Sequence, residues 1–136
     1  MSRENVDVVR RIYDAAARRD VRTPFELYAD DVVWDVSNAR RAAMNPKQVY
    51  EGHEGVREFW RDALSVFGRV DFEVENLIDA DDQVLAVIRE REVGRASGVP
   101  VETTHLAVWT LVGGKVTRMQ LFDDRRAAEK AAGLLE

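Results

Sequence analysis

Apolar residues recur every three or four positions in two stretches of the first half of the chain. In residues 2–19, arginines occupy the faces opposite the apolar positions, which are Val6, Val9, Tyr13, Ala16 and Ala17. In residues 54–67, the apolar positions are Val56, Phe59, Trp60, Ala63, Leu64 and Phe67. This spacing predicts two amphipathic helices, each of which buries one face.

A short helix and a strand are predicted between these two helices. The run Thr23-Pro24-Phe25-Glu26 supplies an N-cap, a proline suited to the first turn and the acid of a capping box, so a helix is expected over residues 23–29. Residues 31–36 are mainly β-branched and aromatic, which favours a strand. A mobile loop is expected over residues 37–49, where two adjacent arginines and an Asn-Pro pair lie.

The second half of the chain alternates between apolar and polar positions, which is typical of strands. Four strands are expected, over residues 70–78, 84–93, 101–112 and 116–122. Gly113-Gly114 predicts a tight hairpin turn, because such turns require positive φ. A last helix should follow a cap at Asp123 or Asp124 and end near Gly133.

This order of elements predicts the fold class. Helices at the front and strands at the back favour an α+β fold with three or four helices, in which a cone-like, curved antiparallel sheet wraps around the N-terminal helix. The chain has 136 residues, of which 46% are hydrophobic, and no linker or repeat divides it. We therefore expect a single domain, residues 1–136, that buries about two-thirds of its unfolded surface.

One expected strand changes character along its length. Residues 84–88 are apolar at every position, whereas residues 89–92 read Arg-Glu-Arg-Glu. A strand that is apolar on both faces is covered on both sides. Helices on one side and the sheet of a second copy on the other would cover it, so we expect a homodimer formed through the sheet.

Composition excludes several classes of function. The chain has no cysteine, which excludes thiol catalysis and zinc–thiolate sites. Its net charge of −5 disfavours general attraction to nucleic acid or anionic membranes, and it contains no run of about 18 apolar residues. We therefore expect a cytoplasmic protein with no nucleic-acid or membrane partner, no metal site and no cofactor.

Short motifs occur along nearly the whole chain in a fixed order. They are Ser2-Arg3-Glu4-Asn5-Val6, Val9-Arg10-Arg11-Ile12-Tyr13, Tyr50-Glu51-Gly52, Glu54-Gly55-Val56, Ser97-Gly98-Val99, Val108-Trp109-Thr110-Leu111, Gly114-Lys115-Val116 and Ala131-Ala132-Gly133-Leu134. In this order they resemble the SnoaL-like branch of the nuclear transport factor 2-like superfamily. That superfamily includes ketosteroid isomerases, polyketide cyclases, epoxide hydrolases, dehydratases and non-catalytic binding modules, so the resemblance implies a fold and a pocket but no single activity.

The known chemistries of this superfamily do not transfer intact to this chain. The resemblance places the base, tyrosine and acid of a ketosteroid isomerase at Val36, Ile12 and near Ala107. It places the acid of a polyketide cyclase at Leu121. For an epoxide hydrolase, Arg89 and Arg91 stand on the corresponding strand, but the paired acids are missing.

Aromatic residues supply candidate pocket walls. The predicted substrate-binding residues are Trp34, Tyr50, Trp60, Trp109 and Met119, with Tyr50 at the rim. Three tryptophans on elements that converge inside the cone suit an aromatic-walled cavity. The alternative is that these side chains simply form the core. The position of Met119 depends on the Gly113-Gly114 turn, since a strict two-residue turn pairs it with Val108, away from His105, and a bulge reverses this.

Four residues are candidates for catalysis. His105 shares strand parity with Trp109 and could pair opposite Arg89, which would favour a neutral imidazole able to act as a base. Asp35 and Tyr13 could also carry protons, while Arg89 could stabilise an anionic oxygen. The alternatives are a histidine that only hydrogen-bonds within the sheet, an exposed strand aspartate, and solvated charge pairs in Arg89-Glu90-Arg91-Glu92.

Two classes of function follow. The first is an acid–base enzyme without a cofactor, an isomerase, cyclase, dehydratase or hydrolase acting on a small hydrophobic molecule that contains oxygen. The second is a dimeric module that binds such a molecule without chemistry.

Overall fold

The computed structural model describes residues 2–39 and 46–135. The described residues form four helices and one six-stranded sheet. The helices are α1 (Ser2–Ala17), α2 (Thr23–Leu27), α3 (Gly52–Val66) and α4 (Arg125–Ala131). The strands are β1 (Tyr28–Asn38), β2 (Val49–Glu51), β3 (Phe67–Ala80), β4 (Gln83–Gly94), β5 (Pro100–Val112) and β6 (Lys115–Phe122). The predicted α+β class is confirmed.

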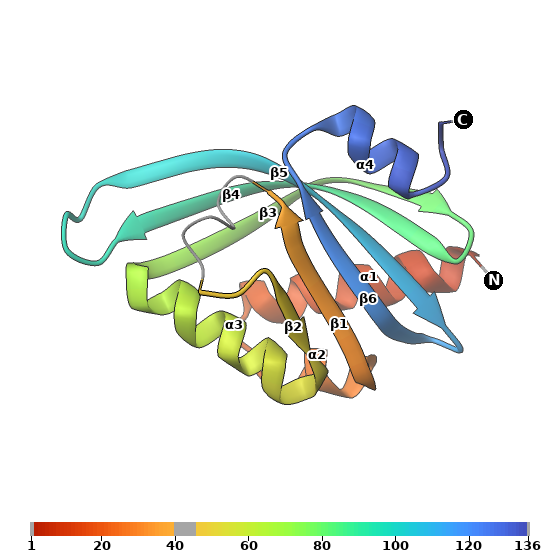
Figure 1. The fold of residues 1–136 in the computed structure, drawn as a ribbon, viewed down its shortest axis with the longest axis horizontal. Helices are drawn as coiled ribbons and strands as arrows, with labels where there is room; N and C mark the ends of the chain where they lie inside the picture. The colour runs from red at the N-terminus through yellow and green to blue at the C-terminus, as the bar shows by residue number, and fades with distance from the viewer. Residues whose placement is uncertain (1, 40–45, 136) are drawn as a thin grey trace.

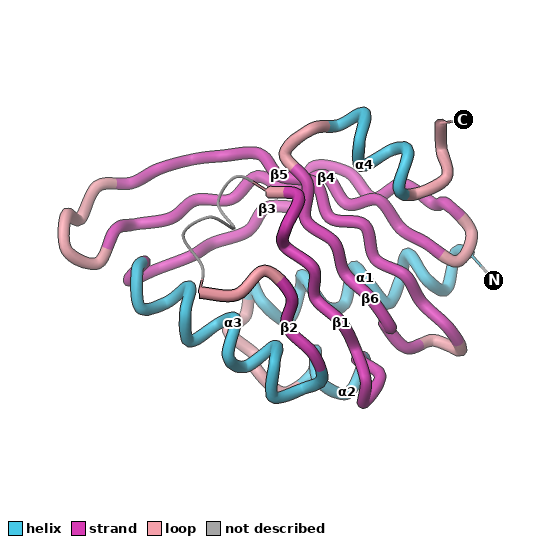
Figure 2. The backbone as a smooth tube through the Cα atoms, viewed as in Figure 1, coloured by secondary structure: helices cyan, strands magenta, loops and turns pink. Residues whose placement is uncertain are grey.

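The sheet is curved and has the strand order β2-β1-β6-β5-β4-β3 (Figure 1). All neighbouring strands are antiparallel except β1 and β6, which are parallel. Figure 2 shows α1, α2 and α3 on one side of the sheet and α4 on the other. We call the face toward α1 the inner face and the face toward α4 the outer face. No helix in the described part of the chain is long and apolar enough to cross a membrane.

Helix α1 packs against β3 and fills part of the cone. Its buried positions Val9, Ile12 and Tyr13 follow the helical spacing read from the sequence. The helix is closed by Arg19, which adopts a left-handed φ of 59°, and by the bond from the Asp20 amide to the Ala15 carbonyl. This C-terminal motif, with an arginine where glycine is usual, ends the helix before residue 19.

The predicted loop over residues 37–49 is shorter than expected. Strand β1 extends to Asn38 and the short β2 begins at Val49, an element that the sequence did not predict. Residues 40–45, on which the expected mobility falls, lie outside the described residues. After β2, Gly52 has a φ of +72°, and a Cβ on Gly55 would lie 3.0 Å from the backbone carbon of Tyr50. Both glycines therefore let α3 start directly against β2.

The turn at Gly113-Gly114 is confirmed, since both residues have positive φ. A register shift interrupts the β5–β6 ladder between Thr110 and Leu111. It pairs Met119 with Trp109 rather than with Val108, so Met119 faces the interior of the cone.

The apolar outer face near the Asp81-Asp82 turn is covered within the chain itself. Leu85 and Val87 of β4 form a second hydrophobic cluster that α4 covers with Ala128 and Ala132. This cluster accounts for the apolar stretch at residues 84–88 without a second copy. The homodimer through the sheet stays a prediction.

Candidate functional site

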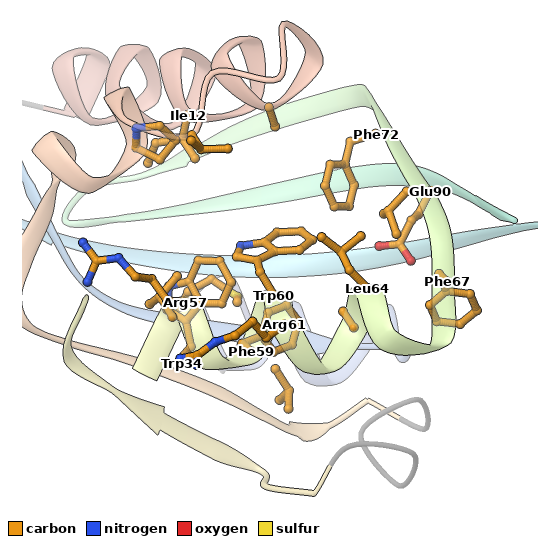
Figure 3. A pocket seen from close by; sticks show the side chains of 18 of the residues that line it. Ile12, Trp34, Arg57, Phe59, Trp60, Arg61, Leu64, Phe67, Phe72 and Glu90 are labelled. Atoms are coloured by element: carbon orange, nitrogen blue, oxygen red, sulfur yellow. The ribbon is translucent and has the colours of Figure 1, made fainter. Parts of the chain in front are cut away.

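The inner face of the sheet, α1, α2 and α3 surround a cavity of about 1460 Å³. Figure 3 shows side chains of α3 projecting toward Ile12 of α1 across this space, with Phe72 and Glu90 of the sheet at one end. A volume of this size exceeds what a drug-sized ligand needs. The cone therefore contains a ligand-sized site rather than a fully packed core.

Trp34 lies at the centre of the aromatic wall of the cavity. Its ring makes edge-to-face contacts with Phe59, Trp60 and Trp109, with centroid separations of 5.2, 6.2 and 6.1 Å. Such contacts add to the stability gained by burial. Among the described residues, the buried Trp34 indole N–H has no hydrogen-bond partner. The wall is thus a connected set of rings drawn from β1, α3 and β5.

Tyr13 of α1 contacts this wall. The Trp109 Nε1–H donates a hydrogen bond of 3.2 Å to the Tyr13 hydroxyl oxygen. Burial raises the pKa of Tyr13 far above its usual value; the bond from Trp109 lowers it, and the charge of Glu90 raises it further. Tyr13 therefore keeps its proton at neutral pH. Because its oxygen already accepts a bond, its O–H is suited to donate to an oxygen in the cavity.

Glu90 and His105 form the buried polar part of the cavity lining. The His105 Nδ1 lies 3.3 Å from the Glu90 Oε1, slightly beyond the usual N–H···O range. Glu90 is only 5% exposed and His105 only 8% exposed. The His105 ring also makes an edge-to-face contact with Phe72, at 6.1 Å between centroids. A carboxylate and an imidazole are thus brought together in apolar surroundings, an arrangement typical of acid–base sites.

The sequence did not identify Glu90 as a site residue, because the register of β4 and β5 differs from the expectation. His105 pairs with Ile88, not with Arg89, so the predicted pairing of His105 with Arg89 is wrong by one residue. A shift of one residue moves every side chain of a strand to the other face. Glu90, two positions from Ile88, therefore faces inward. Ala86 and Ile88 lie on the same face of β4 as Glu90. Which residue of β5 lies opposite each of them depends on the length of the loop between the two strands.

Six of the predicted site residues line the cavity. They are Tyr13, Trp34, Trp60, His105, Trp109 and Met119. They come from α1, β1, α3, β5 and β6, so the fold brings together residues that lie far apart in the sequence. Their positions fit the predicted pocket, while their roles in binding and catalysis stay predictions.

The other three predicted residues lie outside the cavity lining. Asp35 is on the outer face, where its Oδ2 lies 3.0 Å from Arg118. Arg89 is also on the outer face, with 49% of its side chain exposed, and lies 3.4 Å from Glu75. Strand alternation turns both residues away from the cone, so the geometry gives no support to their predicted catalytic roles.

Tyr50 is buried beneath α3 rather than placed at the rim. Its hydroxyl donates a hydrogen bond of 3.0 Å to Asp62, and its exposed fraction is 1%. Burial and the bond to the Asp62 carboxylate raise the pKa of Tyr50 to about 12. Tyr50 therefore fixes α3 to β2, and the structure does not bring it to the cavity.

The inner face continues past Glu90 with another buried acid. Glu92 is 2% exposed, and Thr103 pairs with Glu90 across the strands.

Within residues 2–39 and 46–135, no group of three or more His, Asp or Glu side chains is placed to hold a metal ion. The chemistry that this arrangement offers is proton transfer between a carboxylate, an imidazole and a phenol.

Comparisons with known proteins agree with this architecture. A search of curated proteins found no match. Among solved structures, an NTF2-like protein of unknown function from Burkholderia pseudomallei K96243 is similar, with 19% identity, a TM-score of 0.80, and coverage of 93% of this chain and 95% of that one. TerC, co-crystallised with polyporic acid, is 21% identical over 96% and 98% of the two chains, with a TM-score of 0.79.

A third similar structure is a putative SnoaL-like polyketide cyclase from Jannaschia sp. CCS1. It is 21% identical over 99% of this chain and 95% of that one, with a TM-score of 0.74. At these identities the structures establish the fold alone. A family model for the SnoaL-like domain matches residues 9–119. The chain therefore belongs to the SnoaL-like domain family, and its fold is similar to that of an NTF2-like protein.

Proposed function

We propose that this protein is an enzyme that uses Glu90 and His105 as an acid–base pair on a small hydrophobic molecule containing oxygen. The observation that carries the proposal is the 3.3 Å approach of His105 Nδ1 to Glu90 Oε1 inside an aromatic cavity. A buried carboxylate beside a histidine holds the imidazole in one tautomer and stabilises the imidazolium that forms when it takes a proton.

The proposed step is proton abstraction next to a carbonyl group. In this step the 3.3 Å approach of Glu90 tightens to a hydrogen bond that holds the proton of His105 on Nδ1, which leaves Nε2 as the acceptor. Nε2 takes the proton as the C–H bond breaks, and the electron pair of that bond moves to the carbonyl oxygen to give an enolate. The Tyr13 hydroxyl donates a hydrogen bond to this oxygen. If the substrate is a β,γ-unsaturated ketone, returning the proton from Nε2 to the γ-carbon of the dienolate isomerises it. If the substrate carries a second carbonyl group, attack of the enolate carbon on that group closes a ring, and the new alkoxide takes the proton from Nε2.

The walls of the cavity define the body of the substrate. Trp34, Trp60 and Trp109 offer ring faces and edges, which suit a flat or aromatic molecule. TerC, which is similar in fold, was co-crystallised with polyporic acid. A small organic molecule as the occupant of this cavity is consistent with that likeness.

An assay that does not require the natural substrate to be known tests the proposal. The probe is 2-tetralone, a cyclic ketone fused to a benzene ring, and the measurement is the exchange of its α-protons for deuterium in D₂O, followed by NMR. The wild-type protein is expected to accelerate exchange, and His105→Gln to lose about 10² to 10⁴ of that acceleration. The ¹⁵N shifts of the His105 ring should show the proton on Nδ1 and a mixture of tautomers in Glu90→Gln. A wild-type rate equal to that of His105→Gln would overturn the proposal.

The second candidate function is a non-catalytic binding module. The observation that favours it is the pair Val36 and Leu121, which line the cavity as apolar side chains where the isomerases and cyclases of the superfamily would carry acids. This function predicts that a neutral aromatic probe binds the wild-type protein and His105→Gln equally and that 2-tetralone does not exchange. It becomes the better account if both results are found.

A further inference from the structure

One rim of the cavity is rich in guanidinium groups. Arg22 at the start of α2 and Arg57 and Arg61 of α3 all belong to the cavity lining. Figure 3 shows Arg57 and Arg61 on the opposite side of the cavity from Glu90. Arg57 and Arg61 are four residues apart on a helix, so they project from the same face. The cavity therefore has guanidinium groups at this rim, in addition to those of Arg19, Arg69 and Arg95 elsewhere in the lining, and the Glu90 carboxyl group in its interior.

Arg57 is held in position at this rim. Its guanidinium carbon lies 4.6 Å from the centroid of the Phe25 ring, and its Nη1 lies 3.4 Å from Glu54 Oε2. Phe25 is itself fixed by an edge contact with Tyr28, at 5.5 Å between centroids. Stacking on an aromatic ring leaves the N–H edge of a guanidinium free to donate in its own plane. Arg57 is thus oriented by Phe25 and Glu54, although 51% of its side chain stays exposed, as does 67% of the Arg61 side chain.

The acidic side chain near the rim, Glu54, leaves guanidinium N–H donors available. Glu54 is shared by both helix arginines, with its Oε1 2.8 Å from Arg61, and it does not line the cavity. The side chain of Arg22 forms no hydrogen bond or ion pair with any residue that the structure describes. Each guanidinium carries five N–H donors. These three side chains therefore offer more donors than Glu54 accepts.

Asp20 and Glu26, the lining acids on either side of Arg22 in the sequence, do not cancel this effect. Asp20 accepts bonds from the amides of Arg22 and Thr23 and from the Thr23 hydroxyl. Glu26 lies on the exposed side of α2. The oxygens of Asp20 are therefore occupied by the turn that holds α2.

We infer that the ligand of this cavity is an aromatic or hydrophobic molecule with an anionic oxygen group, such as a carboxylate, at the end held by Arg57 and Arg61. Planar guanidinium groups match the geometry of carboxylate oxygens. Glu90 lies on the opposite side of the cavity from Arg57 and Arg61, so an anion bound at the rim would direct the rest of the ligand toward Glu90 and His105. Placing the neutral, reacting end at His105 rests on the proposed function, whereas the anion site at the rim does not.

Two fluorescent probes isolate the contribution of the anion. 1-Anilinonaphthalene-8-sulfonate and N-phenyl-1-naphthylamine share one aromatic body and differ by a sulfonate. We expect the wild-type protein to bind the sulfonate at least about tenfold more tightly, at one site per chain, with an affinity that falls as salt rises. The double variant Arg57→Gln/Arg61→Gln should bring the sulfonate to the affinity of the neutral probe and leave the neutral probe unchanged.

The charge-matched control is Arg10→Gln/Arg11→Gln, which changes exposed residues of α1 outside the cavity lining. It should leave both affinities within about twofold of wild type, because screening weakens distant charges. Equal binding of the two probes to the wild-type protein would overturn the anion site alone. An equal loss of sulfonate affinity in both double variants would also overturn it. Failure of the neutral probe to bind would instead count against the cavity and hence against the proposed function.

Discussion

The two faces of β4 carry the same kinds of residue in different physical states. On the outer face, Arg89 is half-exposed and lies near Glu75, as charge pairs on many soluble proteins do. On the inner face, Glu90 is buried beside His105. Adjacent residues in the sequence thus differ because water screens one charge and not the other. On this strand, burial distinguishes the candidate acid–base pair from a solvated charge pair.

Toward the Asp81-Asp82 turn both faces become apolar, for separate reasons. Inner positions such as Ala86 belong to the core around Trp34 and Trp109. Outer positions such as Leu85 are covered by α4. The same strand therefore belongs to two hydrophobic clusters at one end, and to a cavity and a solvated surface at the other.

The sharpest test of this contrast compares Glu90→Gln with Arg89→Gln. If the inner face carries the chemistry, Glu90→Gln should reduce exchange of 2-tetralone by about 10² to 10⁴, because general acid–base catalysis contributes that much. Arg89→Gln should change the rate less than about twofold, since an exposed pair contributes little. The rates are measured by NMR in D₂O with folding checked by circular dichroism. Equal losses in the two variants would remove the distinction between the faces.

The outer cluster is tested by Leu85→Ala. Removing this fully buried side chain should lower the free energy of unfolding by about 2–5 kcal/mol, measured by urea denaturation. Val112→Ala is the control, because Val112 is 67% exposed and its truncation should change stability by less than about 0.5 kcal/mol.

The same experiment addresses the predicted homodimer. If α4 alone covers the outer cluster, the effect of Leu85→Ala is independent of protein concentration. A midpoint that rises with concentration would indicate that a second copy contributes to this face.

The sequence predicted elements better than it predicted faces. Helical spacing around Val9 and Tyr13 and the Gly113-Gly114 turn each reflect local physics, and both appear in the structure. Helix α2 begins at Thr23 as expected, but the predicted capping box is wrong: Arg22 is the N-cap, its side chain makes no capping hydrogen bond, and the Thr23 hydroxyl donates to Asp20. The short β2 has only three residues, too few for a periodic pattern. The position of α4 over the sheet also depends on contacts between distant segments, so the apolar stretch in β4 was attributed to a second copy.

Prediction of the candidate site depended on the register of neighbouring strands. The aromatic wall was predictable because large rings such as Trp34 and Trp109 favour the interior whichever neighbours they meet. Glu90 was missed and Arg89 chosen because the loop between β4 and β5 sets the pairing of His105, and local sequence does not determine that loop. The face on which Met119 lies depends on a bulge in the β5–β6 ladder, and the sequence did not determine whether that bulge forms. An error of one residue in the register of a strand assigns each of its side chains to the wrong face of the sheet.

A smaller effect distinguishes two buried hydroxyl groups. Tyr13→Phe should lower the free energy of unfolding by about 1–3 kcal/mol, because it leaves the buried Trp109 N–H without an acceptor. Tyr50→Phe should cost less, about 0.5–1.5 kcal/mol, since Asp62 is partly exposed and water can replace the lost donor. Urea denaturation measures both changes. A larger cost at Tyr50 would mean that the Tyr13–Trp109 bond is not sealed from solvent.

The smallest expected effect tests whether an exposed charge can still be coupled to folding. Bonds from the Thr23 hydroxyl and from the amides of Thr23 and Arg22 lower the pKa of Asp20 to about 2, against an ordinary value of 3.8. A carboxyl whose pKa is lower in the folded state stabilises the fold above its ordinary pKa, and this stabilisation is lost as the pH falls toward the folded value. Asp20→Asn should therefore lower Tm slightly at pH 5–7. The difference from wild type should close between about pH 4 and pH 2, where the wild-type carboxyl gains its proton. A difference that stays constant down to pH 2 would show that the bonds, rather than the charge, hold this turn, and that among the groups considered only buried charges couple strongly to the fold.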